Sequence, residues 1–367
     1  MGHLIDGREE AYRALAERLS RFPIGAVVNE TFMEILKRLY TATEASLGSK
    51  LPLKPLSFEK CGHLTGMGEC ELKAILEGMA AKGLVVDIPR KDSAYYILSP
   101  MVVGFFEYTF MRAGELANKD LAALFEQYFK DEGVAEEVFG ASTKLFKALA
   151  HEKYIPALVH TEVLSYEKAS EIIRQSGGGS LAMCACRHKA THLGKACAAP
   201  VEDICTSLGR PAQWLVRRGF AREASVDDLL RNLERSYRLG LVLLADNVID
   251  EPAYICHCCG CCCGVLRAIT EKKIMSVHPS NFIPVVDPSL CLSCGACLES
   301  CRINAISQNE PAEPAVIDAA TCIGCAVCAN SCPSGALSMT QRSALHTPPQ
   351  NKMAQYISVA LERNRLE

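Results

Sequence analysis

The chain has 367 residues, a formal net charge of −3 and 49% hydrophobic residues. This composition is typical of a globular protein with sizeable cores, and it is not that of a strongly basic binder of nucleic acids or other polyanions. Twenty cysteines would indicate a disulfide framework only in a small secreted chain, so they point here to metal or cluster binding.

No targeting or membrane segment is expected. Residues 1–20 are charged and amphipathic and lack the apolar centre of a secretory signal. The most apolar stretch, near residues 101–111, is interrupted by Glu107 and is too short to cross a bilayer. We therefore expect a cytoplasmic protein without a membrane span, in a reducing compartment and in anaerobic metabolism.

Residues 1–100 form the first domain, in which one helix is followed by the order helix, helix, turn, helix, hairpin. Apolar spacing predicts helices at 11–21, 31–40, 57–64 and 69–82, followed by a hairpin formed by 84–88 and 95–98. Over residues 29–100 this order resembles a winged-helix domain. The resemblance implies either DNA binding through helix 69–82 or a protein-docking or packing role.

Acidic residues at the start of helix 69–82 favour a protein-docking or packing role. Glu69 and Glu71 would face phosphates with the wrong charge, so nucleic acid is not an expected partner. Cys61 and Cys70 are expected to be ordinary buried cysteines.

Residues 101–176 read as an aromatic, helical connector with a possible homo-oligomer face. Helices are expected at 121–129 and 145–159, with the aromatic side chains forming core. His151 and His160 are expected to be hydrogen-bonded interface histidines rather than ligands. Gly177-Gly178-Gly179 then marks a boundary and is interpreted as a flexible hinge.

Residues 177–280 form a cysteine-rich α/β domain. We expect the Cys-x-Cys pair of Cys184 and Cys186 to lie on one face of a strand, with Arg187, His188 and Lys189 beside it favouring thiolates. Ser225 and Asp228 predict a helix to residue 237, residues 241–245 a buried strand, and 265–270 a further helix. The candidate metal-binding residues are Cys184, Cys186, Cys197, Cys205, Cys256, Cys258, Cys259, Cys261, Cys262 and Cys263.

These ten cysteines resemble the cysteine-rich domains that precede ferredoxin modules in iron–sulfur proteins of strict anaerobes. Several arrangements remain open: two [4Fe–4S] clusters, one cluster with a reactive centre, a larger assembly, or zinc. One or more additional iron–sulfur clusters is the preferred expectation.

Residues 281–342 contain a tandem repeat of Cys-x2-Cys-x2-Cys-x3-Cys. The first copy is Cys291, Cys294, Cys297 and Cys301, and the second is Cys322, Cys325, Cys328 and Cys332. A tight loop delivers three thiolates to one cubane, and the fourth reaches the other cluster. We therefore assign Cys291, Cys294, Cys297 and Cys332 to one [4Fe–4S] cluster, and Cys322, Cys325, Cys328 and Cys301 to the second.

This segment resembles the bacterial two-cluster ferredoxins. Arg302 stands where that family usually has proline, and it could shift a potential or mark a docking face. Gly295 and Gly324 are expected to relieve crowding near inorganic sulfide. Zinc or disulfides are the disfavoured alternative, because zinc sites use paired Cys-x2-Cys units.

The overall expectation is an α+β multidomain protein that ends in a charged tail at 343–367, either solvated or facing a partner, with a short linker at 279–284. The preferred function is low-potential electron transfer with a redox partner protein. One alternative is a reductase in which Arg187, His188 and His257 orient substrate or supply protons. The other is a redox-sensing winged-helix regulator, and the sequence leaves open whether the protein is an enzyme.

Overall fold

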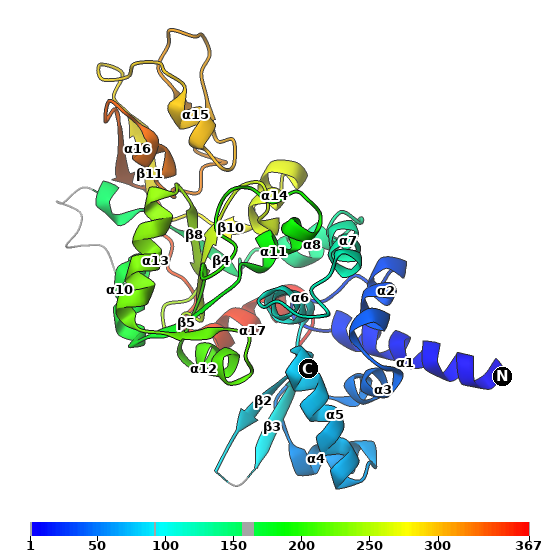
Figure 1. Ribbon diagram of the computed structural model, residues 1–367. Helices are drawn as coiled ribbons and strands as arrows, with labels where there is room; N and C mark the ends of the chain where they lie inside the picture. Colours follow the sequence, from blue (N-terminus) through cyan, green and yellow to red (C-terminus); the bar gives the residue numbers. More distant parts are fainter. Residues whose placement is uncertain (1, 92, 156–164, 367) are drawn as a thin grey trace. The chain divides into compact units, whose positions relative to one another are not determined.

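The computed structural model describes residues 2–91, 93–155 and 165–366 and divides into two compact units (Figure 1). The N-terminal unit is Met1–Ala141 with His188–Gly194 and Ile357–Glu367. The cysteine-rich unit is Ser142–Arg187 with Lys195–Tyr356. Both α-helices and β-strands occur throughout, so the fold is mixed α and β.

The N-terminal unit begins with helices and a small sheet. Its elements are α1 (Gly2–Ser20), α2 (Glu30–Leu39), α3 (Ala42–Lys50), β1 (Leu56–Ser57), α4 (Phe58–Thr65), α5 (Glu69–Lys82), β2 (Val85–Pro89), β3 (Ala94–Leu98), the kinked turn η1 (Met101–Phe105), α6 (Phe106–Phe110), α7 (Lys119–Tyr128) and α8 (Val134–Phe139). The strands pair antiparallel in the order β1-β3-β2.

Local signals explain most of these elements. The prediction of a helix at 69–82 is confirmed by α5, which ends at Gly83 in the left-handed region (φ 77°). Helix α3 was missed although Thr41 and Glu44 form a capping box, because its short, small-residue sequence has little apolar periodicity. Cys61 is buried as expected, whereas the same expectation for Cys70 is wrong, since it is exposed on α5.

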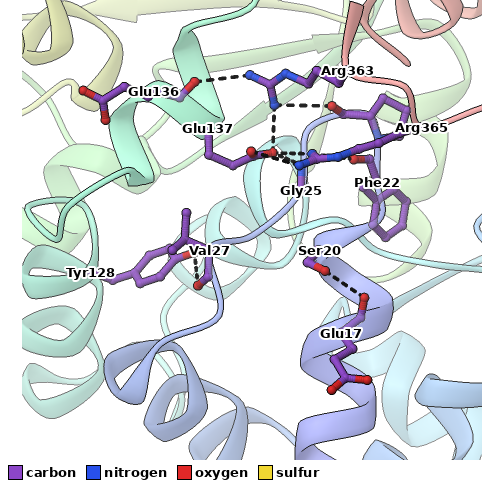
Figure 2. Close-up of polar contacts among 11 residues, drawn as sticks. Glu17, Ser20, Phe22, Gly25, Val27, Tyr128, Glu136, Glu137, Arg363 and Arg365 are labelled. Atoms are coloured by element: carbon purple, nitrogen blue, oxygen red, sulfur yellow. Dashed lines mark hydrogen bonds and ion pairs between the residues drawn. The ribbon is translucent and has the colours of Figure 1, made fainter. Parts of the chain in front are cut away.

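The last residues of the chain pack within this unit instead of forming a solvated tail. The carboxylate of Glu137 accepts hydrogen bonds from the Gly25 amide (2.8 Å) and from the guanidinium groups of Arg363 and Arg365 (Figure 2). Arg363 and Arg365 also donate to the carbonyls of Pro23 and Phe22. Two cations converging on one acid therefore fix this end of the chain.

The cysteine-rich unit is built on a seven-stranded sheet in the order β10-β4-β8-β9-β6-β5-β7. All neighbours are antiparallel except β10 and β4. Its strands are β4 (Phe146–Leu149), β5 (Gly179–Ala182), β6 (Cys205–Leu208), β7 (Arg222–Ala224), β8 (Val242–Asp246), β9 (Tyr254–Cys258) and β10 (Val277–His278). Its helices are η2 (Glu152–Tyr154), η3 (Ser165–Glu167), α10 (Ala169–Ser176), α11 (Ala185–His192), α12 (Gly209–Arg217), α13 (Val226–Arg238), α14 (Gly264–Lys272) and α17 (Lys352–Glu362), of which α11 and α17 continue into the N-terminal unit.

Helices α10 and α13 cover one face of this sheet (Figure 1). Ser225 and Asp228 form the expected capping box of α13. Leu229 and Leu233 of α13 pack with Leu243 and Ile255 of the sheet in a buried cluster. Truncating one such leucine to alanine costs about 2–5 kcal/mol, so this core holds β8 and β9 firmly.

Two predictions for this unit differ from the structure. The sequence predicts a helix at 145–159, but residues 146–149 form strand β4, because all four side chains are buried in the sheet. Residues 156–164, including His160, lie outside the described part of the chain. The glycines at 177–179 are no hinge. Gly177 caps α10, and Gly179 pairs in β5, where a Cβ would meet the Ser207 carbonyl oxygen at 2.2 Å.

The repeated cysteine segment is held by two short strand pairs. β11 (Phe282–Val286) pairs with β14 (Leu337–Gln341), and β12 (Ile306–Ser307) pairs with β13 (Val316–Ile317). The expected linker at 279–284 thus already enters β11. Short helices α15 (Ala296–Ser300) and α16 (Val327–Ser331) follow equivalent loops.

The two expected glycines have different roles. A Cβ at Gly324 would meet the Phe282 carbonyl oxygen at 2.1 Å, so close backbone contact requires a glycine there. Gly295 has open space around it, but its φ of 75° favours glycine.

Candidate iron–sulfur and metal sites

The first thiol set lines one pocket in the repeated segment. Cys291, Cys294, Cys297 and Cys332 line this pocket together with apolar neighbours such as Leu298. Cys294 is exposed and Cys297 is buried. Three thiols thus come from the first repeat and one from the second, which is the arrangement a cubane needs.

The second thiol set is more deeply enclosed. Cys301, Cys322, Cys325 and Cys328 interact electrostatically with one another, and Cys328 is buried. Burial raises the pKa of Cys325 to about 12. Iron bound by these thiols would lower their pKa values again, because metal coordination favours the thiolate.

Arg342 borders the second thiol set and was not recognised from the sequence. Its guanidinium donates to the carbonyls of Cys322 (2.7 Å) and Ser280 (3.0 Å). It also opposes the effect of burial on the Cys322 pKa. A single arginine beyond the repeat carries no motif, so only the fold brings it to this place.

Four of the ten cysteines of the middle segment converge tightly. The sulfurs of Cys197, Cys259, Cys261 and Cys262 all lie within 4.8 Å of one another. Cys259 and Cys262 are buried, Cys197 is half-buried and Cys261 is exposed. We call these residues the four-cysteine group.

Five more form a neighbouring string of thiols. Cys263 contacts Cys258 at 3.4 Å and also hydrogen-bonds Cys186, while Cys258 hydrogen-bonds Cys256. Cys184 interacts electrostatically with Cys263 and Cys256. We call Cys184, Cys186, Cys256, Cys258 and Cys263 the five-cysteine group.

The expectation of a Cys-x-Cys strand is wrong in its local structure. Strand β5 ends at Ala182 and α11 begins at Ala185, so Cys184 precedes the helix and Cys186 lies in its first turn. Both thiols still face Cys263, because the strand-to-helix turn presents them together. Cys205 begins β6 opposite Ala182 and does not belong to the four-cysteine group.

Arg187 lies between the two groups and is fully buried. It donates to the carbonyls of Pro200 (2.6 Å) and His257, and it hydrogen-bonds the Cys259 thiol. Burial alone would lower the pKa of Arg187, but Cys184 and Cys259 more than reverse this. The pKa of Cys259 falls to about 4 through a hydrogen bond with Cys262 and the Arg187 charge.

The other proposed polar residues have structural partners. His188 bonds the Phe110 carbonyl (2.8 Å), and Lys189 forms an ion pair with Glu126 (2.5 Å). His257 is buried and bonds Ser236 (2.7 Å), and burial lowers its pKa to about 3. Of Arg187, His188 and Lys189, which are expected to favour thiolates, Arg187 is therefore the one that contacts the thiols.

A close backbone contact joins the two cysteine regions. Gly260 lies between Cys259 and Cys261, and a Cβ there would meet the Arg302 carbonyl oxygen at 2.5 Å. Arg302 directly follows Cys301, and its side chain donates to the Gly240 carbonyl (3.4 Å). A lone glycine within a cysteine run was the only sequence signal of this contact.

Comparison with known proteins identifies one part of the chain. A family model described as "4Fe-4S dicluster domain" matches residues 290–336, which contain all eight cysteines of the repeat. Neither a curated protein nor a solved structure matches the chain. The protein therefore carries a 4Fe-4S dicluster domain and is an iron–sulfur protein. In the described part of the chain, no helix is both long and apolar enough to cross a membrane.

Proposed function

We propose that this protein relays low-potential electrons between a dicluster ferredoxin domain and metal centres in the middle cysteine segment. The contact between Gly260 and Arg302 carries the proposal, because it brings the backbone beside Cys301 against the loop of Cys259 and Cys261. [4Fe–4S] clusters, when bound, accept and release single electrons. The chain's own part is to hold such centres at short separation.

In this proposal the first thiol set and the second thiol set each hold one [4Fe–4S] cluster. The pocket around Cys291, Cys294, Cys297 and Cys332 and the mutual contacts of the second set support this crossed assignment. The five-cysteine group holds a further cluster. Its thiols form an open string, in which no three sulfurs lie as close together as those of the four-cysteine group, and they exceed the four that a cubane requires.

A redox partner protein would approach the first thiol set in this proposal. Cys294 is exposed there, and the side chain of Leu292 is 67% exposed. In the second set Cys322 and Cys328 are buried, and Cys301 and Cys325 are half-buried. This difference supports entry or exit of electrons at the first set.

The N-terminal unit is proposed to be a winged-helix-like docking module, with the protein working in the cytoplasm of an anaerobic cell. Its order of helices and the β2–β3 hairpin support this interpretation. Glu69 and Glu71 are exposed at the start of α5, where phosphate contacts would require cations. A filter-binding assay with duplex DNA should accordingly show no salt-sensitive binding.

The relay is tested by anaerobic iron and acid-labile sulfide analysis with EPR of the reduced protein. The dicluster domain accounts for about eight irons, and a third cluster raises the total to about twelve. The double variant Cys184→Ala/Cys186→Ala should lose about four irons and one reduced EPR signal. Cys332→Ser and Cys301→Ser should each remove a different dicluster signal.

If the double variant keeps all its iron, the five-cysteine group holds no cluster and the relay does not extend beyond the dicluster domain. If Cys301→Ser and Cys332→Ser remove the same signal, the crossed assignment is wrong. Cys70→Ser, which alters an exposed cysteine of α5, is the matched control and should change nothing.

A further inference from the structure

The four-cysteine group is too compact for a cubane. A zinc–sulfur bond of about 2.3 Å in a tetrahedron places neighbouring sulfurs about 3.8 Å apart. The four sulfurs here lie within 4.8 Å of one another, close to that separation. In a cubane each thiolate binds a different iron corner, so the thiolates must stand further apart.

The same chain provides an internal comparison. All eight thiols of the dicluster domain lie in the described residues, and none belongs to a group this tight. Four of those thiols, Cys291, Cys294, Cys297 and Cys332, instead line one pocket. The four-cysteine group is spaced to surround one ion.

The sequence spacing of the four cysteines and the loops that carry them also suit a single metal ion. Cys259 and Cys262 have the Cys-x2-Cys spacing of tetrahedral metal sites and lie between β9 and α14. Cys197 comes from the distant loop between α11 and β6, so one ion would tie two loops together. A closed set of four thiolates is the composition of structural zinc sites and of single-iron sites.

Arg187 supplies the charge that such a site needs. Four thiolates around a divalent ion leave an excess of two negative charges. The buried guanidinium hydrogen-bonds Cys259, as the outer partners of metal ligands commonly do. A buried cation is also costly without a nearby anion, so the arginine and the thiolates stabilise each other.

We propose that Cys197, Cys259, Cys261 and Cys262 bind a single tetrahedral metal ion, separate from any iron–sulfur cluster. The ion is Zn²⁺ or one iron without sulfide, since both suit four thiolates. This site does not depend on the proposed relay. Zinc would stabilise the conformation of the loop between β9 and α14, which contains Gly260 and contacts Arg302. Iron would in addition provide a redox centre in this loop.

The test combines metal analysis with spectroscopy on the full-length, anaerobically purified protein. Mass spectrometry for zinc and iron is set against acid-labile sulfide. The wild type should contain about one zinc per chain, or about one iron in excess of sulfide. The double variant Cys197→Ser/Cys261→Ser changes the two least buried ligands and should lose only that ion.

The variant should keep its sulfide and its reduced dicluster EPR signals, and Cys70→Ser should resemble the wild type. Loss of about four irons and four sulfides would mean a cubane and would overturn the proposal. Unchanged metal content would overturn it as well.

A second measurement examines the ion and its ligands directly. X-ray absorption at the zinc edge should show four sulfurs at about 2.3 Å and no nearby metal. If the ion is iron, the oxidised protein should show a high-spin ferric EPR signal that is absent from the double variant. Oxygen or nitrogen ligands at the zinc edge, or neither signal, would refute the site. The dicluster signals report separately on the relay.

Discussion

At the scale of single residues, Gly260 shows how one missing side chain shapes the site. Its Cα faces the Arg302 carbonyl, and no Cβ fits between the two backbones. Gly264 lies four residues later, and nothing stands within 4 Å of the position its Cβ would take. The two glycines form a matched pair for substitution.

Gly260→Ala should lower stability by about 1–3 kcal/mol, because the backbones must separate to admit a methyl group. An anaerobic thermal melt should show a lower Tm, by roughly 2–4 °C for each kcal/mol. Gly264→Ala should leave Tm nearly unchanged. Equal effects of the two substitutions would show that the contact with Arg302 does not matter.

Arg342 is a second residue whose role comes from its surroundings. Its positive charge lies beside Cys322, and reduction of a cluster held there adds a negative charge. A cation stabilises the reduced form, so removing it should make the potential more negative. Arg342→Gln should lower the potential of the second cluster by on the order of 50 mV.

This shift is measured by an anaerobic EPR redox titration. Arg342→Lys keeps the positive charge but loses the planar guanidinium group that hydrogen-bonds the carbonyls of both Cys322 and Ser280. It should therefore restore most of the potential. A potential that moves equally in both variants would indicate a structural effect rather than a charge effect.

At the scale of elements, the end of the chain is held by an ion-pair network on α8. The side chains of Glu137 and Arg363 are only 17% and 14% exposed, so water screens their attraction weakly. Neutralising the acid would leave two partly buried cations without their partner.

Glu137→Gln should destabilise the N-terminal unit by about 2–3 kcal/mol, since bonds to charged groups are lost. Thermal unfolding followed by circular dichroism would measure this. Glu34→Gln is the control, because Glu34 pairs with Lys37 on an exposed surface (49% and 32% exposed). It should cost no more than about 0.5 kcal/mol.

Helices with a capping residue and an apolar stripe could be predicted from the sequence. Strands whose place depends on pairing with distant strands could not. Helix α13 carries a capping box and an apolar stripe, and it forms where expected. Strand β4 has no alternation to reveal it, because its four residues are all buried between β10 and β8. Periodicity cannot separate a buried strand from a buried helix segment.

At the scale of the whole molecule, the cysteines are divided unequally between the units. The twenty cysteines include only Cys61 and Cys70 in the N-terminal unit. The other eighteen belong to the cysteine-rich unit. Metal should therefore stabilise one unit and leave the other nearly unaffected.

Removing the metals anaerobically with a chelator should expose this difference in hydrogen exchange. Amides of β9, α14 and the loops around Cys291 and Cys322 should lose protection, since thiolates without metal repel or protonate. Amides of α2 and α5 should keep theirs. Equal loss of protection in both units would mean that they unfold as one cooperative body.

The sequence by itself determined the chemistry: the repeated cysteine spacing, which a dicluster family model matches, and a second cysteine-rich segment. Spacing of this kind is local, because three ligands within one loop need no knowledge of the fold. Only the tertiary structure decided how the middle cysteines divide into groups of four and five, that Arg187 reaches Cys259, that Arg342 borders Cys322 and that Gly260 meets Arg302. These are contacts between segments far apart in the chain, and they depend on sheet register and on close backbone packing that no local pattern encodes.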